Sequence, residues 1–127
     1  MNRPLHVLVV EDDLDIREAV GDLLDEDGFQ VSCAGNGREA LERLAREALP
    51  DVILLDLRMP VMDGWAFKAA LDAEPRLRPI PVVVMSADST AAQRGVGSEA
   101  GWHLRKPISV DELLGLLSVV REHLWRS

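Results

Sequence analysis

The sequence predicts an α/β fold, with an open five-stranded parallel sheet and helices on both of its faces. Apolar runs of strand length alternate with segments of helical period along the whole chain. Three of these runs are apolar almost throughout, which is typical of strands buried on both faces of a parallel sheet. The length of 127 residues, with 47% hydrophobic and 28% charged residues, fits one globular domain. We therefore expect a single domain over residues 1–127, with no output domain.

The expected strands differ in strength. The long apolar runs cover residues 5–10, 52–55 and 81–85. Residues 30–34 are a weaker candidate, expected nearer an edge of the sheet, and residues 102–104 are a short one.

The expected helices lie between and after these strands. The first should end at Gly28 and the second should begin near Asn36 and end before Pro50. The third should end at Pro75, and the last should begin at Ser109, where the residues form a capping box.

The last helix has more apolar residues than one face needs. Its expected core stripe consists of Val110, Leu113, Leu114, Leu117 and Leu124. The residues assigned outside that stripe are Leu116, Val119 and Val120. With Trp102 they are candidates for a partner surface, and ordinary burial is the alternative.

A fourth helix is expected over residues 90–101. Gly95 and Gly97 each cost about 1 kcal/mol relative to alanine in a helix interior. We therefore expect this helix to be short or irregular.

Polar side chains follow four of the five expected strands, at the carboxyl ends where open parallel sheets form their sites. They are Glu11 and Asp12, Asp56, Ser86 and Lys106. Neighbouring strands lie about 4.8 Å apart, so carboxylates on adjacent strand ends would crowd together. A hard cation such as Mg²⁺, or Mn²⁺, would neutralise them. Singly, such residues are often turns or helix caps, but together and in this order they indicate a site.

This set of residues suits phosphoryl chemistry. Beside a cation, Asp56 could act as a nucleophile toward phosphorus. The cation and Lys106 would stabilise negative charge on the transferring group. Ser86 could donate a hydrogen bond to the product phosphoryl group.

Several segments together resemble the receiver domain of two-component response regulators, over nearly the full chain. They cover residues 7–13, 51–64, 82–87 and 106–107, and the Asp-x-x-Met-Pro-x-Met-Asp-Gly run that begins at Asp56 is highly specific. The resemblance implies a flavodoxin-like sheet in the order 2-1-3-4-5. It also implies a phosphorylation-switched signalling module that phosphorylates and slowly dephosphorylates itself, rather than a turnover enzyme.

The resemblance also assigns roles to single residues. Asp56 would be the phosphoacceptor. The metal ligands would be Glu11, Asp12, Asp56 and the backbone carbonyl of Arg58. Contacts to the phosphoryl group and the switch would come from Ser86, Lys106 and His103.

Further assignments concern geometry and rate. The peptide bond before Pro107 would be cis. His103 stands where most relatives have an aromatic residue, so coupling to Ser86 would differ here. Arg58 and Asp88 would flank an attacking water and tune the phosphoryl lifetime.

The expected partners are proteins. The phosphodonor would be a sensor histidine kinase or a phosphotransfer protein, and a downstream protein would read the face formed by the fourth helix, fifth strand and fifth helix. The net charge of −8 disfavours direct nucleic-acid contact and anionic membranes. The apolar run near the N-terminus is too short for a membrane span, so a cytoplasmic protein is expected.

Three other functions would fit parts of the sequence. A receiver-like scaffold would act through protein contacts without phosphorylation. An aspartyl-nucleophile phosphohydrolase usually has a second aspartate where Arg58 stands, and a cap insertion that this chain lacks. A dinucleotide site at residues 35–40 would follow a weak second strand rather than a strong first one.

Overall fold

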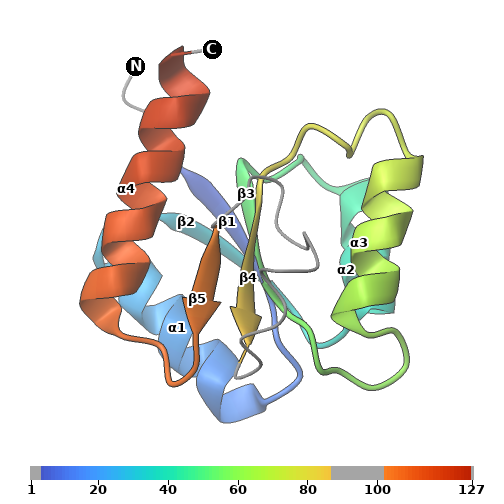
Figure 1. Ribbon diagram of the computed structural model, residues 1–127, viewed down its shortest axis with the longest axis horizontal. Coiled ribbons are helices and arrows are strands. Elements are labelled where there is room, and N and C mark those ends of the chain that lie inside the picture. The colour runs from blue at the N-terminus through green and yellow to red at the C-terminus, as the bar shows by residue number, and fades with distance from the viewer. Residues whose placement is uncertain (1–3, 87–101, 127) are drawn as a thin grey trace.

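The computed structural model describes residues 4–86 and 102–126 (Figure 1). In chain order the elements are β1 (His6–Val10), α1 (Leu14–Glu26), β2 (Gln30–Ala34), α2 (Gly37–Arg46), β3 (Val52–Asp56), α3 (Gly64–Ala73), β4 (Val82–Ser86), β5 (His103–Arg105) and α4 (Val110–Arg126). The helix expected over residues 90–101 lies outside the described residues, so the label α4 denotes the C-terminal helix.

The five strands form one parallel sheet in the order β2-β1-β3-β4-β5, which confirms the predicted topology. Every residue of β1, β3 and β4 is buried, as their continuous apolar runs predicted. β2 lies at one edge and is only partly buried, with Gln30 exposed.

Helices cover both faces of the sheet (Figure 1). On one face, α1 and α4 contribute their buried side chains to a core with β1, β3 and β4, and these helix residues are Val20, Leu24, Leu113, Leu117 and Val120. On the other face, α2 and α3 contribute Ala40, Leu44, Phe67 and Leu71. No helix in the described ranges has the length and apolar character to cross a membrane.

A short polar side chain lies at the start of each described helix. Before α4 it is the predicted Ser109, whose Oγ accepts a hydrogen bond from the N–H of Glu112 at 3.4 Å. Asp13, Asn36 and Asp63 are the N-caps of α1, α2 and α3, and each accepts a hydrogen bond from the backbone N–H three residues later, at 3.2, 2.9 and 2.9 Å. Gly28, with a φ of 92°, follows the end of α1 as predicted. Asp13 follows β1, and Asp63 lies at the end of the loop that follows β3. The helices that these two aspartates cap therefore begin near the carboxyl end of the sheet.

The predicted core stripe of the last helix is partly wrong. Val110 is 47% exposed, whereas Val120 is fully buried among the core residues. Leu113, Leu117 and Val120, spaced four and three residues apart, form the buried stripe instead. Val120 is therefore not available for a partner, while Val119 is 52% exposed.

Candidate functional site

The register of the sheet brings two carboxylates side by side. Val10 of β1 pairs with Leu55 of β3, so the residues that follow them, Glu11 and Asp56, sit at neighbouring strand ends. Both are buried, with 1% and 4% of their surface exposed. Two buried carboxylates this close repel each other unless a positive charge compensates them.

A third carboxylate completes an acidic cluster. Asp12 is exposed, and one carboxylate oxygen from each of Glu11, Asp12 and Asp56 lies within 4.8 Å of the others. Carboxylate oxygens are the ligands that Mg²⁺ and Mn²⁺ prefer, and together with a backbone carbonyl and waters they fit an octahedral site. The donor set therefore fits the predicted cation.

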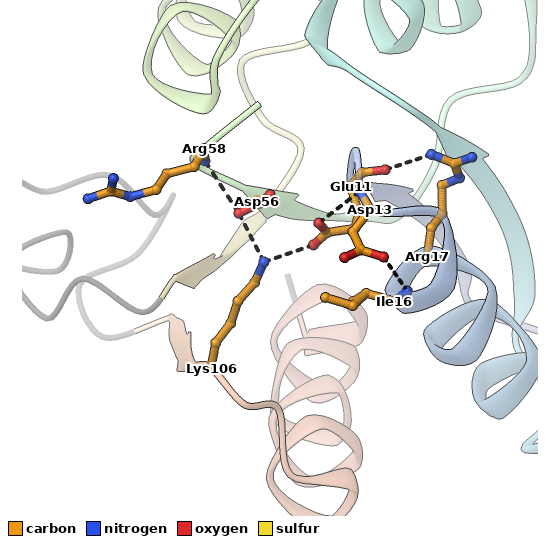
Figure 2. Close-up of polar contacts among 7 residues, drawn as sticks. All are labelled: Glu11, Asp13, Ile16, Arg17, Asp56, Arg58 and Lys106. Atoms are coloured by element: carbon orange, nitrogen blue, oxygen red, sulfur yellow. Dashed lines mark hydrogen bonds and ion pairs between the residues drawn. The ribbon is translucent and has the colours of Figure 1, made fainter. Parts of the chain in front are cut away.

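Lys106 supplies the positive charge of the site. Its Nζ lies 3.1 Å from Oε2 of Glu11 and 3.2 Å from Oδ1 of Asp56, so it bridges the two buried carboxylates (Figure 2). It reaches them from the loop between β5 and α4, and its peptide bond to Pro107 is cis. The lysine thus lies where it can contact a group attached to Asp56.

Burial and charge shift the pKa values of this pair. Burial, followed by the charge of Asp56, raises the pKa of Glu11 from 4.5 to about 7, although Lys106 opposes the rise. Burial lowers the pKa of Lys106, but its hydrogen bond to Glu11 and the charge of Asp56 outweigh that effect and raise the pKa overall. Lys106 therefore stays charged at neutral pH.

Backbone groups also fix the carboxylates. The N–H of Asp13 donates to Oε1 of Glu11, and the N–H of Arg58 donates to Oδ1 of Asp56, both at 3.3 Å (Figure 2). Arg17, which was not predicted, donates from its guanidinium to the carbonyl of Glu11 at 2.8 Å. Its place one turn into the helix that follows Glu11 was the only signal of this role in the sequence.

A cleft of about 610 Å³ adjoins the acidic cluster. The residues that line it are Asp12, Leu57, Arg58, Met59, Pro60, Asp63, Trp65 and Ser86. Ser86 is buried at the end of β4, and the residue before it, Met85, pairs with Asp56 of β3. The predicted serine, arginine and acidic residues therefore share one end of the sheet.

Two predicted residues are not joined to this group by any described contact. His103 begins β5 and pairs with Val84, two residues before Ser86, and within residues 4–86 and 102–126 its buried Nε2 has no hydrogen-bond partner. Asp88 lies outside the described residues. The suggested roles of both in switching and lifetime remain predictions.

Comparisons with known sequences identify the family. The family model described as the response regulator receiver domain matches residues 7–118. The transcriptional regulatory protein PrrA of Mycobacterium leprae is 44% identical over 110 residues, covering 85% of this chain and 46% of PrrA. The response regulator MprA of Mycolicibacterium vanbaalenii is 36% identical over 117 residues, covering 87% of this chain and 48% of MprA. The chain thus spans about half the length of these relatives.

Solved structures agree with the sequence matches. The chemotaxis response regulator CheY4 of Vibrio cholerae has a TM-score of 0.80 and 33% identity, covering 92% of this chain and 98% of that one. The receiver domain of the sensor histidine kinase PA1611 from Pseudomonas aeruginosa, solved with magnesium in its active-site cleft, has a TM-score of 0.77 and 28% identity, covering 90% and 94%. By its sequence and its fold, the chain belongs to the response regulator receiver domain family.

Proposed function

We propose that this chain is a phosphorylation-switched signalling module in which Asp56 accepts a phosphoryl group with the help of Mg²⁺. The observation that carries the proposal is the position of Asp56, which is buried beside Glu11 and bridged to it by Lys106. Asp12 adds a third carboxylate to the same cluster. A structural cap or turn would not require three carboxylates and a lysine at the ends of adjacent strands.

The proposed cation site uses oxygen ligands from three segments. Glu11, Asp12, Asp56 and the backbone carbonyl of Arg58 would hold Mg²⁺, and Mn²⁺ suits the same ligands. The bound ion would neutralise the carboxylates and draw electron density from the phosphoryl oxygens. The receiver domain of PA1611, with magnesium in its cleft, supports this assignment.

The proposed transfer is a displacement at phosphorus. A carboxylate oxygen of Asp56 forms a bond to the phosphorus of a phosphohistidine on a sensor kinase or phosphotransfer protein, and the phosphorus–nitrogen bond breaks. The histidine nitrogen keeps the electron pair of that bond and takes up a proton. Lys106 would balance the added negative charge, and the hydroxyl of Ser86 would donate to a phosphoryl oxygen. Slow hydrolysis of the acyl phosphate would return Asp56 to its carboxylate.

The proposed output is a protein contact made in the cytoplasm. The response would reach a downstream partner through the surface that includes β5 and α4, where Val119 of α4 is exposed. The helix expected over residues 90–101, which lies outside the described residues, belongs to the same predicted output face. A charge of −8 disfavours nucleic acid as the direct ligand of this domain. PrrA, about twice as long, is named as a transcriptional regulatory protein, so an output carried by other segments of a longer protein is compatible with the proposal.

The lifetime of the phosphoryl group is proposed to depend on Arg58 and Asp88. Arg58 is exposed and lines the cleft beside Asp56, where its side chain would hinder an attacking water. The variant with both residues changed to alanine should lose its phosphoryl group faster than the wild type. An unchanged half-life in the assay below would reject this role.

The central test is incubation of the purified chain with phosphoramidate and Mg²⁺, followed by intact-mass spectrometry. We expect one added phosphoryl group per chain, which disappears with EDTA and in Asp56→Asn. Asp22→Asn is the matched control, because it makes the same chemical change at an exposed aspartate of α1 that does not line the cleft.

The possible results separate the competing functions. An adduct that survives Asp56→Asn would refute the assignment of the phosphoacceptor. Absence of any adduct would favour a scaffold that is not phosphorylated. Sustained release of phosphate over many turnovers would indicate a phosphohydrolase.

A further inference from the structure

The loop between β3 and α3 holds an unfavourable backbone conformation. Val61 has a φ of 68°, although it is β-branched and 74% exposed. The N–H of Met62 donates to the carbonyl of Pro60 at 2.7 Å, which closes a tight turn around Val61. A β-branched residue adopts a positive φ only where the surrounding structure enforces it. Something outside the turn must therefore hold this loop in place.

One end of the loop is closed on itself. The N–H of Gly64 donates to the carbonyl of Leu57 at 3.0 Å, which brings the start of α3 against the end of β3. A Cβ on Gly64 would lie 2.6 Å from Cα of Leu57 and 2.8 Å from the carbonyl oxygen of Asp56. This contact fixes the base of the loop but does not reach Val61.

The other contact joins the loop to α2. The carbonyl of Met62 accepts a hydrogen bond from the N–H of Gly37, the first residue of α2, at 3.3 Å. The Met62 side chain occupies the space that a side chain at Gly37 would need. A Cβ there would lie 2.9 Å from Cγ, 3.0 Å from Sδ and 3.0 Å from the carbonyl oxygen of Met62. We call this contact between Met62 and Gly37 the α2 latch.

The latched loop carries a proposed metal ligand. Arg58 begins the loop, and its N–H donates to Oδ1 of Asp56 at 3.3 Å (Figure 2). The segment from Arg58 to Met62 is therefore tied at its start to the phosphoacceptor and near its end to α2. If Met62 shifts, only this short, turned segment can absorb the movement before it reaches Arg58.

We infer that Met62 is a positioning residue, whose contact with Gly37 holds the loop so that the Arg58 backbone completes the cation site. This inference rests on the proposed function, because it concerns affinity for the same cation. Neither Met62 nor Gly37 supplies a ligand atom to the acidic cluster. The latch acts on the site only through the loop.

Substitution of Gly37 tests the latch most directly. Gly37→Ala places a methyl group against Met62 and should displace the loop. We expect the dissociation constant for Mg²⁺, measured by titration calorimetry, to rise about tenfold, as is usual when support around a metal ligand is lost. In EDTA, the amide hydrogens of Met62 and Gly64 should exchange faster than in the wild type. Exchange in EDTA tests the loop itself, independently of bound metal.

Variants at Met62 test the latch even if Gly37→Ala fails to fold. Met62→Ala removes the side-chain half of the latch and should also weaken Mg²⁺ binding, whereas Met62→Leu, of similar volume, should keep nearly full affinity. In the double variant Gly37→Ala with Met62→Ala, the smaller side chain makes room for the methyl group. We therefore expect the double variant to bind more tightly than Gly37→Ala alone.

Gly115→Ala is the matched control. Gly115 also lies in a helix, but nothing approaches the position of its missing Cβ within 4 Å. Its Mg²⁺ affinity and loop exchange should equal those of the wild type. Wild-type affinity and exchange in both Gly37→Ala and Met62→Ala would overturn the inference. Failure of the wild type to bind Mg²⁺ would instead refute the proposed cation site, and unchanged exchange in EDTA would then still reject the latch.

Discussion

Glu11 is a buried carboxylate with one neighbour that repels it and one that stabilises it. Burial and the charge of Asp56 raise its pKa from 4.5 to about 7, even with Lys106 at 3.1 Å. Below pH 4.5 the residue is protonated in both the folded and the unfolded chain. Between pH 4.5 and 7 only the folded chain keeps the proton, so the free energy of unfolding falls as the pH rises. Above pH 7 the full cost of the buried charge remains.

We therefore expect Glu11→Gln to gain stability relative to the wild type as the pH rises. With metal removed by EDTA, the difference in unfolding free energy should move in favour of the variant by up to about 3 kcal/mol between pH 4.5 and 8. Urea unfolding at several pH values measures it.

Glu18→Gln, at an exposed position of α1, controls for the loss of one negative charge. A difference between Glu11→Gln and the wild type that stays constant across this pH range would contradict the cause assigned to the shift.

At the level of residues, the acidic residues and Lys106 were easier to predict from the sequence than the residues that hold them in place. Glu11, Asp56 and Lys106 are charged residues at or just after the ends of strands, so their residue types and their order along the chain indicated the site. Arg17 binds a backbone carbonyl, an interaction that any long donor at that place could make. The positive φ of Val61 could not be predicted, because a β-branched residue disfavours that conformation.

At the scale of elements, the C-terminal helix shows where periodicity is ambiguous. α4 has apolar residues on more than one side, so two stripes fit its sequence. Packing against the sheet selects the stripe that contains Val120, which is fully buried, and leaves its neighbour Val119 52% exposed. The strands were more predictable, because the apolar runs of β1, β3 and β4 are buried on both faces and need no choice of side.

This pair of valines offers a matched test. Val120→Ala removes two buried methyl groups from the core and should lower the free energy of unfolding by about 2 kcal/mol. Val119→Ala makes the same chemical change at an exposed position and should alter it by less than about 0.5 kcal/mol. Urea denaturation of both variants measures the difference. Equal losses would mean that the helix turns a different face to the sheet.

At the scale of the whole molecule, the acidic cluster links folding to cation binding. Its carboxylates come from the ends of β1 and β3, which are adjacent only in the folded sheet. The unfolded chain separates these segments and should bind Mg²⁺ weakly. Bound Mg²⁺ should therefore stabilise the fold, by about 2.7 kcal/mol when its free concentration is one hundred times the dissociation constant.

Asp12→Ala should lose much of this stabilisation without damage to the core, because Asp12 is the exposed member of the cluster. Each tenfold loss of affinity removes about 1.4 kcal/mol at saturating Mg²⁺. Asp15→Ala, which removes an exposed acid from the first turn of α1, is the charge-matched control and should keep the full effect. Thermal or urea unfolding with and without Mg²⁺, at constant ionic strength, compares the three proteins. Equal stabilisation of all three would show that Mg²⁺ acts on the net charge of −8 rather than at this cluster.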